Sequence, residues 1–157
     1  RMYGDRELDS DSLVTIEGTL ISVSDVHTMK DTPVTNGRMA FISRSLFPQL
    51  VSEVSQHWGT ELFTDADRYA HYQFGAPQDI GDTYVSYVAD LDKRGSFGVS
   101  LEAGPYVACY LRDPSSTEVP YLFLGCAEME VNKSSSSIRV EAYLGEMGFE
   151  LRTFSPG

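Results

Sequence analysis

Positive charge is scarce in this chain, and its scarcity excludes one large class of function. Lysine and arginine together number 12, whereas aspartate and glutamate number 23, so the formal net charge is −11 at pH 7. Proteins that bind nucleic acid through phosphate contacts need a basic surface, and anionic membranes also attract basic segments. The composition therefore predicts no nucleic-acid binding through this domain and no membrane binding.

Long hydrophobic runs are also missing. No apolar stretch reaches the roughly 18 residues that a membrane-spanning helix needs, and no signal peptide is evident. The chain begins Arg-Met-Tyr-Gly, without an initiator methionine, so we expect a trimmed piece of a longer protein. Residues 1–12 are polar and acidic and are predicted to form a flexible arm, followed by a single β-rich domain over residues 13–157.

Histidine is rare, and the three histidines match no catalytic motif. The chain contains no G-x-S-x-G, no H-E-x-x-H and no glycine-rich phosphate loop. His27 follows Asp25 closely and has serines nearby, but catalytic triads are assembled from distant segments, so this adjacency carries little weight. Contact with a helix dipole explains His57, and a structural or surface role explains His71. The sequence therefore predicts no catalytic residues, no cofactor and no enzymatic activity.

Only two cysteines are present, Cys109 and Cys126, and both lie in apolar runs that are typical of strands. Free cysteine is among the most buried residue types, so two buried free thiols are expected rather than a disulfide. Two cysteines do not by themselves determine the redox compartment. Asn132 begins the sequence Asn-Lys-Ser, which matches the acceptor motif for N-linked glycosylation and matters only if the chain enters the secretory route.

Two pairs of acidic residues are the candidate metal ligands. Asp65 and Asp67 flank a single residue, as do Asp90 and Asp92, and Ca²⁺ is bound by several oxygens gathered in one loop. The segment beginning at Asp90 resembles the start of an EF-hand loop but lacks the oxygen ligands of its fifth and twelfth positions. We interpret it as a hairpin turn with solvated acids, and retain Asp65 and Asp67 as candidate ligands of a Ca²⁺ ion shared between subunits.

Strand signals fill most of the chain. The longest alternating run is Gly81–Leu91, which predicts a strand with one face in a core. Further strands include Leu13–Val23, with a bulge at Gly18, and Tyr121–Val131, with a possible bulge site at Gly125. About nine such strands, separated by turn residues, favour an antiparallel β-sandwich that is similar to a jelly roll.

One amphipathic helix is predicted at about residues 46–58. Apolar residues recur there at helical spacing, namely Phe47, Leu50, Val51, Val54 and Trp58. Pro48 falls in the first turn, where its missing N–H has no cost, and Gly59 suits the end of the helix. The helix is expected to cover one side of a sheet or to close one end of a barrel.

Aromatic residues are abundant, with nine tyrosines, eight phenylalanines and one tryptophan. Packing in the core and across strands accounts for most aromatic residues on strands. A second interpretation is a tyrosine-rich contact face, because tyrosine is large, rigid and amphipathic. For such a face we predict Tyr69, His71, Tyr84 and Tyr87 as interaction residues.

Two segments together resemble the coat proteins of small icosahedral RNA viruses. The run PQDIGDTYVSYVADL is similar to the strand that closes their jelly-roll shell domain, and its matching residues are Gly81, Tyr84, Val85, Tyr87, Ala89 and Leu91. The run SRSLFPQLVSEVSQHW is similar to the short helix that follows an "FP" in such shells. The chain departs from the family because it has no basic RNA-binding arm and continues with further strands. The resemblance implies a capsid or protruding domain that forms a homo-oligomer on a virion or another extracellular surface.

These observations predict a non-enzymatic binding or assembly module, such as a viral capsid or protruding domain that acts in self-assembly or in attachment to a protein or glycan receptor. One alternative is an acidic inhibitor or nucleic-acid mimic, in which the acidic residues would gather in one stripe. Another is a small ligand-binding β-barrel or hydrolase, in which a histidine would meet a carboxylate or a serine in a pocket.

Overall fold

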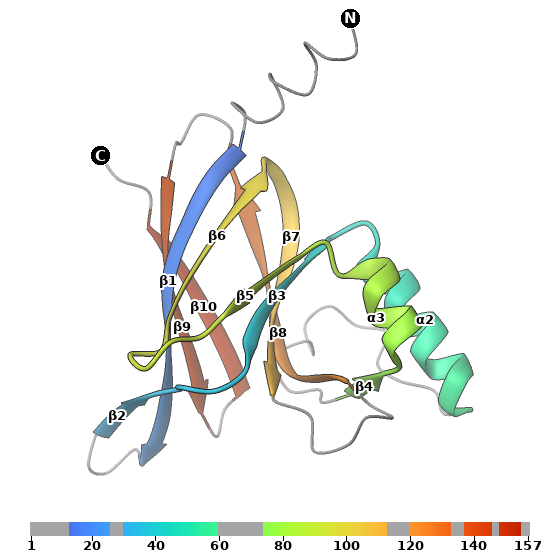
Figure 1. The fold of residues 1–157 in the computed structure, drawn as a ribbon, viewed down its shortest axis with the longest axis horizontal. Coiled ribbons are helices and arrows are strands. Elements are labelled where there is room, and N and C mark those ends of the chain that lie inside the picture. Colours follow the sequence, from blue (N-terminus) through green and yellow to red (C-terminus); the bar gives the residue numbers. More distant parts are fainter. Residues whose placement is uncertain are drawn as a thin grey trace, which may run out of the picture.

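The computed structural model describes residues 13–25, 30–59, 74–112, 120–132, 137–145 and 148–154. Within these ranges, strands form two sheets, and a pair of helices packs on the outer face of one of them (Figure 1). The expected β-sandwich with an amphipathic helix is therefore confirmed. The arm predicted at residues 1–12 lies outside the described residues.

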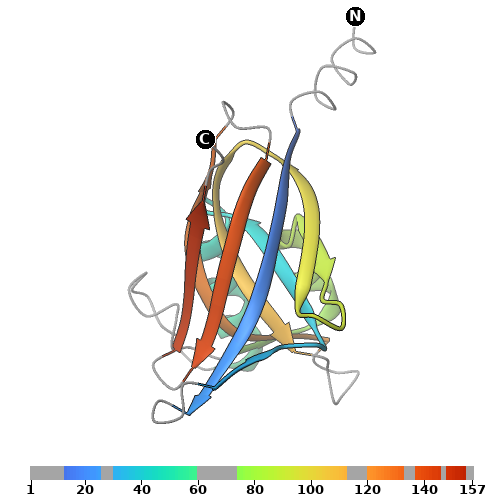
Figure 2. The ribbon, with the colours of Figure 1, turned by 90° about the vertical axis from the view of Figure 1, so that its left-hand side faces the viewer.

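The first sheet, sheet A, is built around the long strand β1 (Leu13–Asp25). Strand β9 (Ser137–Gly145) pairs with one edge of β1 in parallel, and β10 (Gly148–Phe154) pairs with β9 antiparallel. The other edge of β1 is divided between β6 (Ser96–Glu102) along its first half and β2 (Lys30–Pro33) along its second half. Figure 2 shows this sheet face-on, with the helices behind it. The parallel β1–β9 pair departs from the purely antiparallel sheet that was expected.

The second sheet, sheet B, is antiparallel throughout. In spatial order its strands are β4 (Phe74–Ala76), β8 (Tyr121–Val131), β7 (Gly104–Arg112), β3 (Arg38–Ser43) and β5 (Tyr87–Asp90). The chain crosses from sheet B to sheet A between β5 and β6 and returns between β6 and β7. The turn at Lys93–Gly95 therefore joins two sheets and is not the hairpin that was predicted.

Two hydrophobic cores lie on opposite faces of sheet B. The core between the sheets includes Val14, Ile16, Leu20, Met39, Phe41, Phe97, Leu101, Ala108, Met129 and Val131. The core between sheet B and the helices includes Ile42, Phe47, Leu50, Val54, Phe74, Val107, Leu111 and Phe123. Because sheet B is covered on both faces, all six residues from Tyr106 to Leu111 in β7 are buried, and they form a continuous, mostly apolar run.

Helix α2 (Phe47–Trp58) confirms the predicted helix. It buries Phe47, Leu50, Val51 and Val54. Gly59 follows its last residue with a left-handed backbone (φ 67°), and the N–H of Gly59 reaches the carbonyl of Gln56. No helix among the described residues is long and apolar enough to cross a membrane.

The strand predicted over Gly81–Leu91 is wrong in its first half. Residues Gln78–Tyr84 form helix α3, and only Tyr87–Asp90 form a strand. Pro77 precedes the helix in an extended conformation and Asp79 lies in its first turn, both of which favour a helix start. The four alternating residues from Gly81 to Tyr84 span scarcely more than one helical turn, which is too short for a period of two to exclude a helix.

The two predicted bulges have different outcomes. Strand β1 pairs without interruption through Gly18 on both edges, so the bulge predicted there is wrong. Leu20 simply continues the buried track of β1, and the pairing with β2 shifts later, between Val23 and Asp25. The irregularity suggested at Gly125 is confirmed, because the register of β8 against β7 shifts at that glycine.

The expectation of free thiols is wrong, because Cys109 and Cys126 form a disulfide. The two residues lie opposite each other on β7 and β8, with their Cα atoms 4.1 Å apart. The irregularity at Gly125 changes which residues of β8 face the helices, so that Phe123 and Cys126 lie on the same face. Cross-strand register, which local sequence does not reveal, therefore decides the state of the cysteines.

Candidate binding surface at the end of helix α2

The last residue of α2, Trp58, is the only tryptophan of the chain and was expected in the buried face of the helix. Instead its side chain is 46% exposed, although Val54, one turn earlier, is fully buried. The indole reaches β4, a strand of three residues at the edge of sheet B. The last turn of α2 thus extends to β4, which is the edge strand of sheet B among the described residues.

Two contacts fix the orientation of the Trp58 ring. Its indole Nε1–H donates a hydrogen bond of 2.8 Å to the carbonyl oxygen of Gly75 in β4. The His57 ring meets it edge-on, with ring centroids 4.5 Å apart and an angle of 86° between the planes. Because the polar N–H is already engaged, the exposed part of the indole is its hydrocarbon and π surface. A ring held in this way loses little conformational entropy when a ligand stacks on it.

The polar side chains that accompany Trp58 on the last turn of α2 are Gln56 and His57. Gln56 and His57 are exposed beside it, and they offer amide and imidazole groups that can donate and accept hydrogen bonds. The preceding carboxylate on the helix, Glu53, accepts a hydrogen bond from the hydroxyl of Tyr84 in α3. We name the group of Gln56, His57 and Trp58 the α2-end surface.

Of the four predicted interaction residues, the structure describes two, and it packs them against different cores. Tyr84 is partly buried at the core between sheet B and the helices. Tyr87 is partly buried at the core between the sheets, where its ring meets that of Tyr106 edge-on at 6.2 Å. The structure therefore does not bring these two tyrosines together. Tyr69 and His71 lie outside the described residues.

The candidate Ca²⁺ ligands Asp65 and Asp67 also lie outside the described residues. In the part of the chain that is described, no group of three or more His, Cys, Asp or Glu side chains could hold a metal ion. Asp92 closes the turn between β5 and β6, because its Oδ1 accepts the backbone N–H groups of Ser96 at 2.9 Å and Arg94 at 2.8 Å. These hydrogen bonds lower the pKa of Asp92 and give it a structural role.

A polar cluster anchors α3 to the start of β8. The ring of Tyr121 packs on Gly81, the Arg38 guanidinium lies 5.8 Å from the ring centroid, and the Tyr121 hydroxyl donates to Asp82. Burial, followed by the hydrogen bond and charge of Asp82, raises the pKa of Tyr121 to about 12. The same hydrogen bond, with a second from Gln78, lowers the pKa of Asp82.

Tyr106 and Tyr121 make the stability of the fold sensitive to alkaline pH. The pKa values of both Tyr121 and Tyr106 are raised from 10.0 to about 12, chiefly by burial. Their contribution to stability is fully present below pH 10, and it is lost as the pH rises through about 12, because the unfolded chain releases the phenolic protons first. In urea unfolding experiments, the urea concentration at the midpoint should fall as the pH is raised from 10 to about 12. The slope should be shallower for Tyr121→Phe, and a slope unchanged by that substitution would contradict the assignment.

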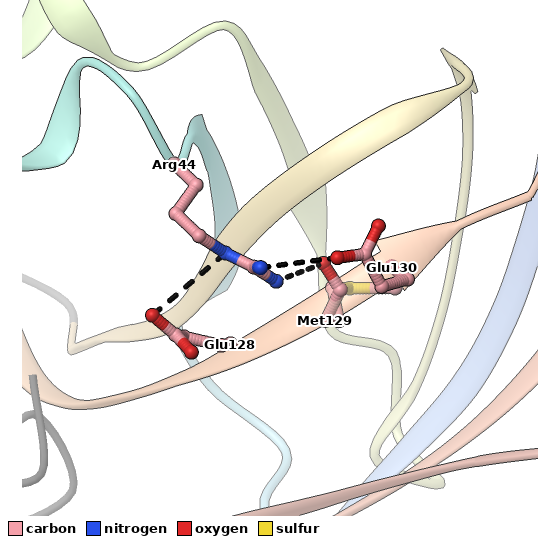
Figure 3. A network of polar contacts seen from close by, with 4 residues as sticks. All are labelled: Arg44, Glu128, Met129 and Glu130. Atoms are coloured by element: carbon pink, nitrogen blue, oxygen red, sulfur yellow. Dashed lines mark hydrogen bonds and ion pairs between the residues drawn. The ribbon is translucent and has the colours of Figure 1, made fainter.

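Ion pairs join the end of β3 to the end of β8, on the face of sheet B that the helices cover elsewhere (Figure 3). The Arg44 guanidinium lies 3.0 Å from a Glu130 carboxylate oxygen and 3.7 Å from a Glu128 oxygen, and it donates to the carbonyl of Met129 at 2.9 Å. This network ties the end of β3 to β8. Because the guanidinium already binds protein oxygens, we assign it a structural role, and exposed pairs of this kind contribute about 0–1 kcal/mol each.

No protein-family model and no curated protein matches this sequence. Among solved structures, a candidate carbohydrate binding protein from Pseudomonas aeruginosa is similar over 89% of this chain and 96% of its own, with a TM-score of 0.49 and 14% identity. The minor pilin of Streptococcus agalactiae is similar over 85% of this chain, which spans 44% of the pilin chain, with a TM-score of 0.40 and 14% identity. The function of this chain must therefore be inferred from its own residues.

Proposed function

We propose that this chain is a non-enzymatic binding domain that attaches to a saccharide ligand through the α2-end surface. The observation that carries the proposal is the exposed Trp58 indole, which its hydrogen bond to Gly75 holds in a fixed orientation. A large exposed aromatic side chain weakens solubility, and tryptophan is enriched among the residues that dominate binding energy at interfaces. Such a ring is well placed to receive a ligand.

The chemistry around Trp58 favours a sugar ring over a cation. The C–H face of a pyranose ring stacks on an indole, and the hydroxyl groups at its rim can form hydrogen bonds with the side chains of Gln56 and His57. A cation would also be attracted to the indole face. A cation is held most firmly where a carboxylate accompanies the ring, and neither Gln56 nor His57 supplies one, whereas their amide and imidazole groups suit uncharged hydroxyl groups.

The disulfide favours an extracellular location for this binding. Structural disulfides persist in oxidising compartments and are rare in the cytosol, and Cys109 and Cys126 are bonded in a core that excludes water. The resemblance to viral coat proteins rests largely on a run that folds as α3 followed by β5. Attachment at a cell or virion surface is therefore a proposal supported by the disulfide, and self-association of the domain stays a prediction from the sequence.

The alternative functions find less support among the described residues. Exposed acidic residues occur on both sheets and both helices, a distribution that does not favour the single acidic stripe of a nucleic-acid mimic; examples are Glu17, Glu53, Asp79, Glu102 and Glu128. His57 contacts the ring of Trp58 on the exposed end of α2. The other two histidines of the hydrolase hypothesis, His27 and His71, lie outside the described residues.

The chain has a single tryptophan, so fluorescence excited at wavelengths beyond the tyrosine absorption band reports on Trp58 alone. Titration with a panel of purified gluco-, manno-, galacto- and chito-oligosaccharides should identify at least one that shifts the emission to shorter wavelength and protects the indole from iodide quenching. Calorimetry should then show that Trp58→Ala weakens binding of that oligosaccharide by at least about tenfold, while Trp58→Phe retains part of the affinity.

Val88→Ala is the matched control, because Val88 is also an exposed apolar residue (38%) but lies on β5, in a different part of the fold. It should leave both the fluorescence response and the affinity unchanged. The proposal fails if no oligosaccharide in the panel alters Trp58 emission or quenching. It fails equally if Trp58→Ala binds the oligosaccharide as tightly as the native chain.

A further inference from the structure

We infer that Asn132 is an acceptor for an N-linked oligosaccharide. The sequence Asn132-Lys133-Ser134 has the acceptor pattern, and it is one of only two places where asparagine occurs in the chain. By itself this pattern is common by chance. Two observations from the structure, independent of each other and of the sequence motif, give it weight.

The first observation is the position of Asn132. It is the residue directly after β8, it has no regular secondary structure, and it is exposed to solvent. Val131 before it is buried and pairs with Gly104 of β7, so the sheet ends immediately before the acceptor. An oligosaccharide is bulky and hydrated and belongs on the surface, in a connection between elements, and Asn132 meets this condition.

The second observation is the Cys109–Cys126 disulfide. Disulfides form in the oxidising compartments through which secreted chains pass, and N-linked glycosylation takes place on the same route.

The glycosylation reaction requires a lipid-linked oligosaccharide diphosphate as donor. The amide nitrogen of Asn132 forms a bond to the anomeric carbon of the sugar, the bond from that carbon to the diphosphate oxygen breaks, and the amide proton is released with the lipid diphosphate.

The fold also separates this acceptor from the α2-end surface. Gly75, the acceptor of the Trp58 hydrogen bond, pairs with Leu122 at the start of β8, whereas Asn132 follows its end. Ten residues of strand between Leu122 and Asn132 span about 33 Å. An oligosaccharide on Asn132 would thus leave Trp58 accessible, so the two proposals can be tested separately.

The test is expression of the full chain behind a secretion leader in eukaryotic cells, followed by intact-mass measurement of the secreted protein. We expect added mass that peptide-N-glycosidase removes, leaving aspartate at position 132 in the peptide map. Asn132→Gln and Ser134→Ala should each abolish the added mass. Asn36→Gln is the matched control, because Asn36 is also exposed but is followed by Gly-Arg and has no acceptor pattern.

A secreted, disulfide-bonded chain whose mass equals that of the unmodified polypeptide would overturn the inference. So would added mass that survives in Asn132→Gln, since it would then belong to another residue. Iodide quenching of Trp58 should be equal before and after glycosidase treatment. Protection of Trp58 by the attached oligosaccharide would contradict the separation of the two sites.

Discussion

Loss of the Cys109–Cys126 disulfide is expected to lower the free energy of unfolding by about 3 kcal/mol. The bond closes a loop between residues 17 positions apart in the sequence, and reduction gives the unfolded chain back the conformational entropy of that loop. Reduction does not stabilise the folded chain to compensate, because the two thiols stay buried in the core between sheet B and the helices. For a domain of this size, a loss of this magnitude is a large share of the total stability.

Urea unfolding of the native chain with and without reductant measures this effect. The double variant Cys109→Ala/Cys126→Ala should unfold at a lower urea concentration than the oxidised native chain, and reductant should not alter its midpoint. That insensitivity is the control for direct effects of the reductant. An oxidised native chain and a fully reduced one with equal midpoints, after thiol titration has confirmed complete reduction, would refute the expectation.

Gly81→Ala is the second substitution with a large expected effect, and it should destabilise the fold by about 1–3 kcal/mol. A Cβ atom at Gly81 would lie 2.0–2.5 Å from three carbons of the Tyr121 ring, closer than real contacts permit. The ring cannot move away cheaply, because its hydroxyl is bonded to Asp82 and Arg38 lies over it. In an isolated helix the same substitution would be stabilising by up to about 1 kcal/mol, so the sign of the effect reports on the packing of α3 against β8.

Gly98→Ala provides the matched control for this prediction. Gly98 is exposed on β6, and its nearest neighbour to an added Cβ is the carbonyl oxygen of Ile16 at 3.9 Å, an ordinary contact. Thermal and urea unfolding should place Gly98→Ala near the native chain and Gly81→Ala well below it. In a Tyr121→Ala background, which removes the obstructing ring, Gly81→Ala should cost little. Equal stability of the two alanine variants would show that α3 does not pack on Tyr121 as described.

Local periodicity in the sequence was sufficient for much of the fold. The spacing of Phe47, Leu50, Val51 and Val54 determined helix α2 and its buried face, because a helix repeats every 3.6 residues wherever it packs. Alternation and turn residues determined the β-sandwich class, and Gly125 marked an irregularity in β8. Each of these features depends on residues that are close together in the chain.

The candidate site was less accessible to such reasoning. Periodicity assigned Trp58 to the buried face, whereas the structure places it, exposed, beside the edge strand β4 of sheet B. The choice of Tyr84 and Tyr87 followed from an alternating run that the structure divides between a helix and a strand. Tyr69, His71, Asp65 and Asp67 lie outside the described residues and remain predictions.

The sequence by itself determined the class of the fold, the position of α2 and the acidic character of the surface. Tertiary structure decided the disulfide, helix α3, the parallel β1–β9 pair and the exposure of Trp58. The physical reason is the same in each case. Each of these features depends on contacts between residues far apart in the chain, which no local pattern records. The contacts are the register between strands, the packing of Gly81 on Tyr121 and the position of α2 relative to the edge of sheet B.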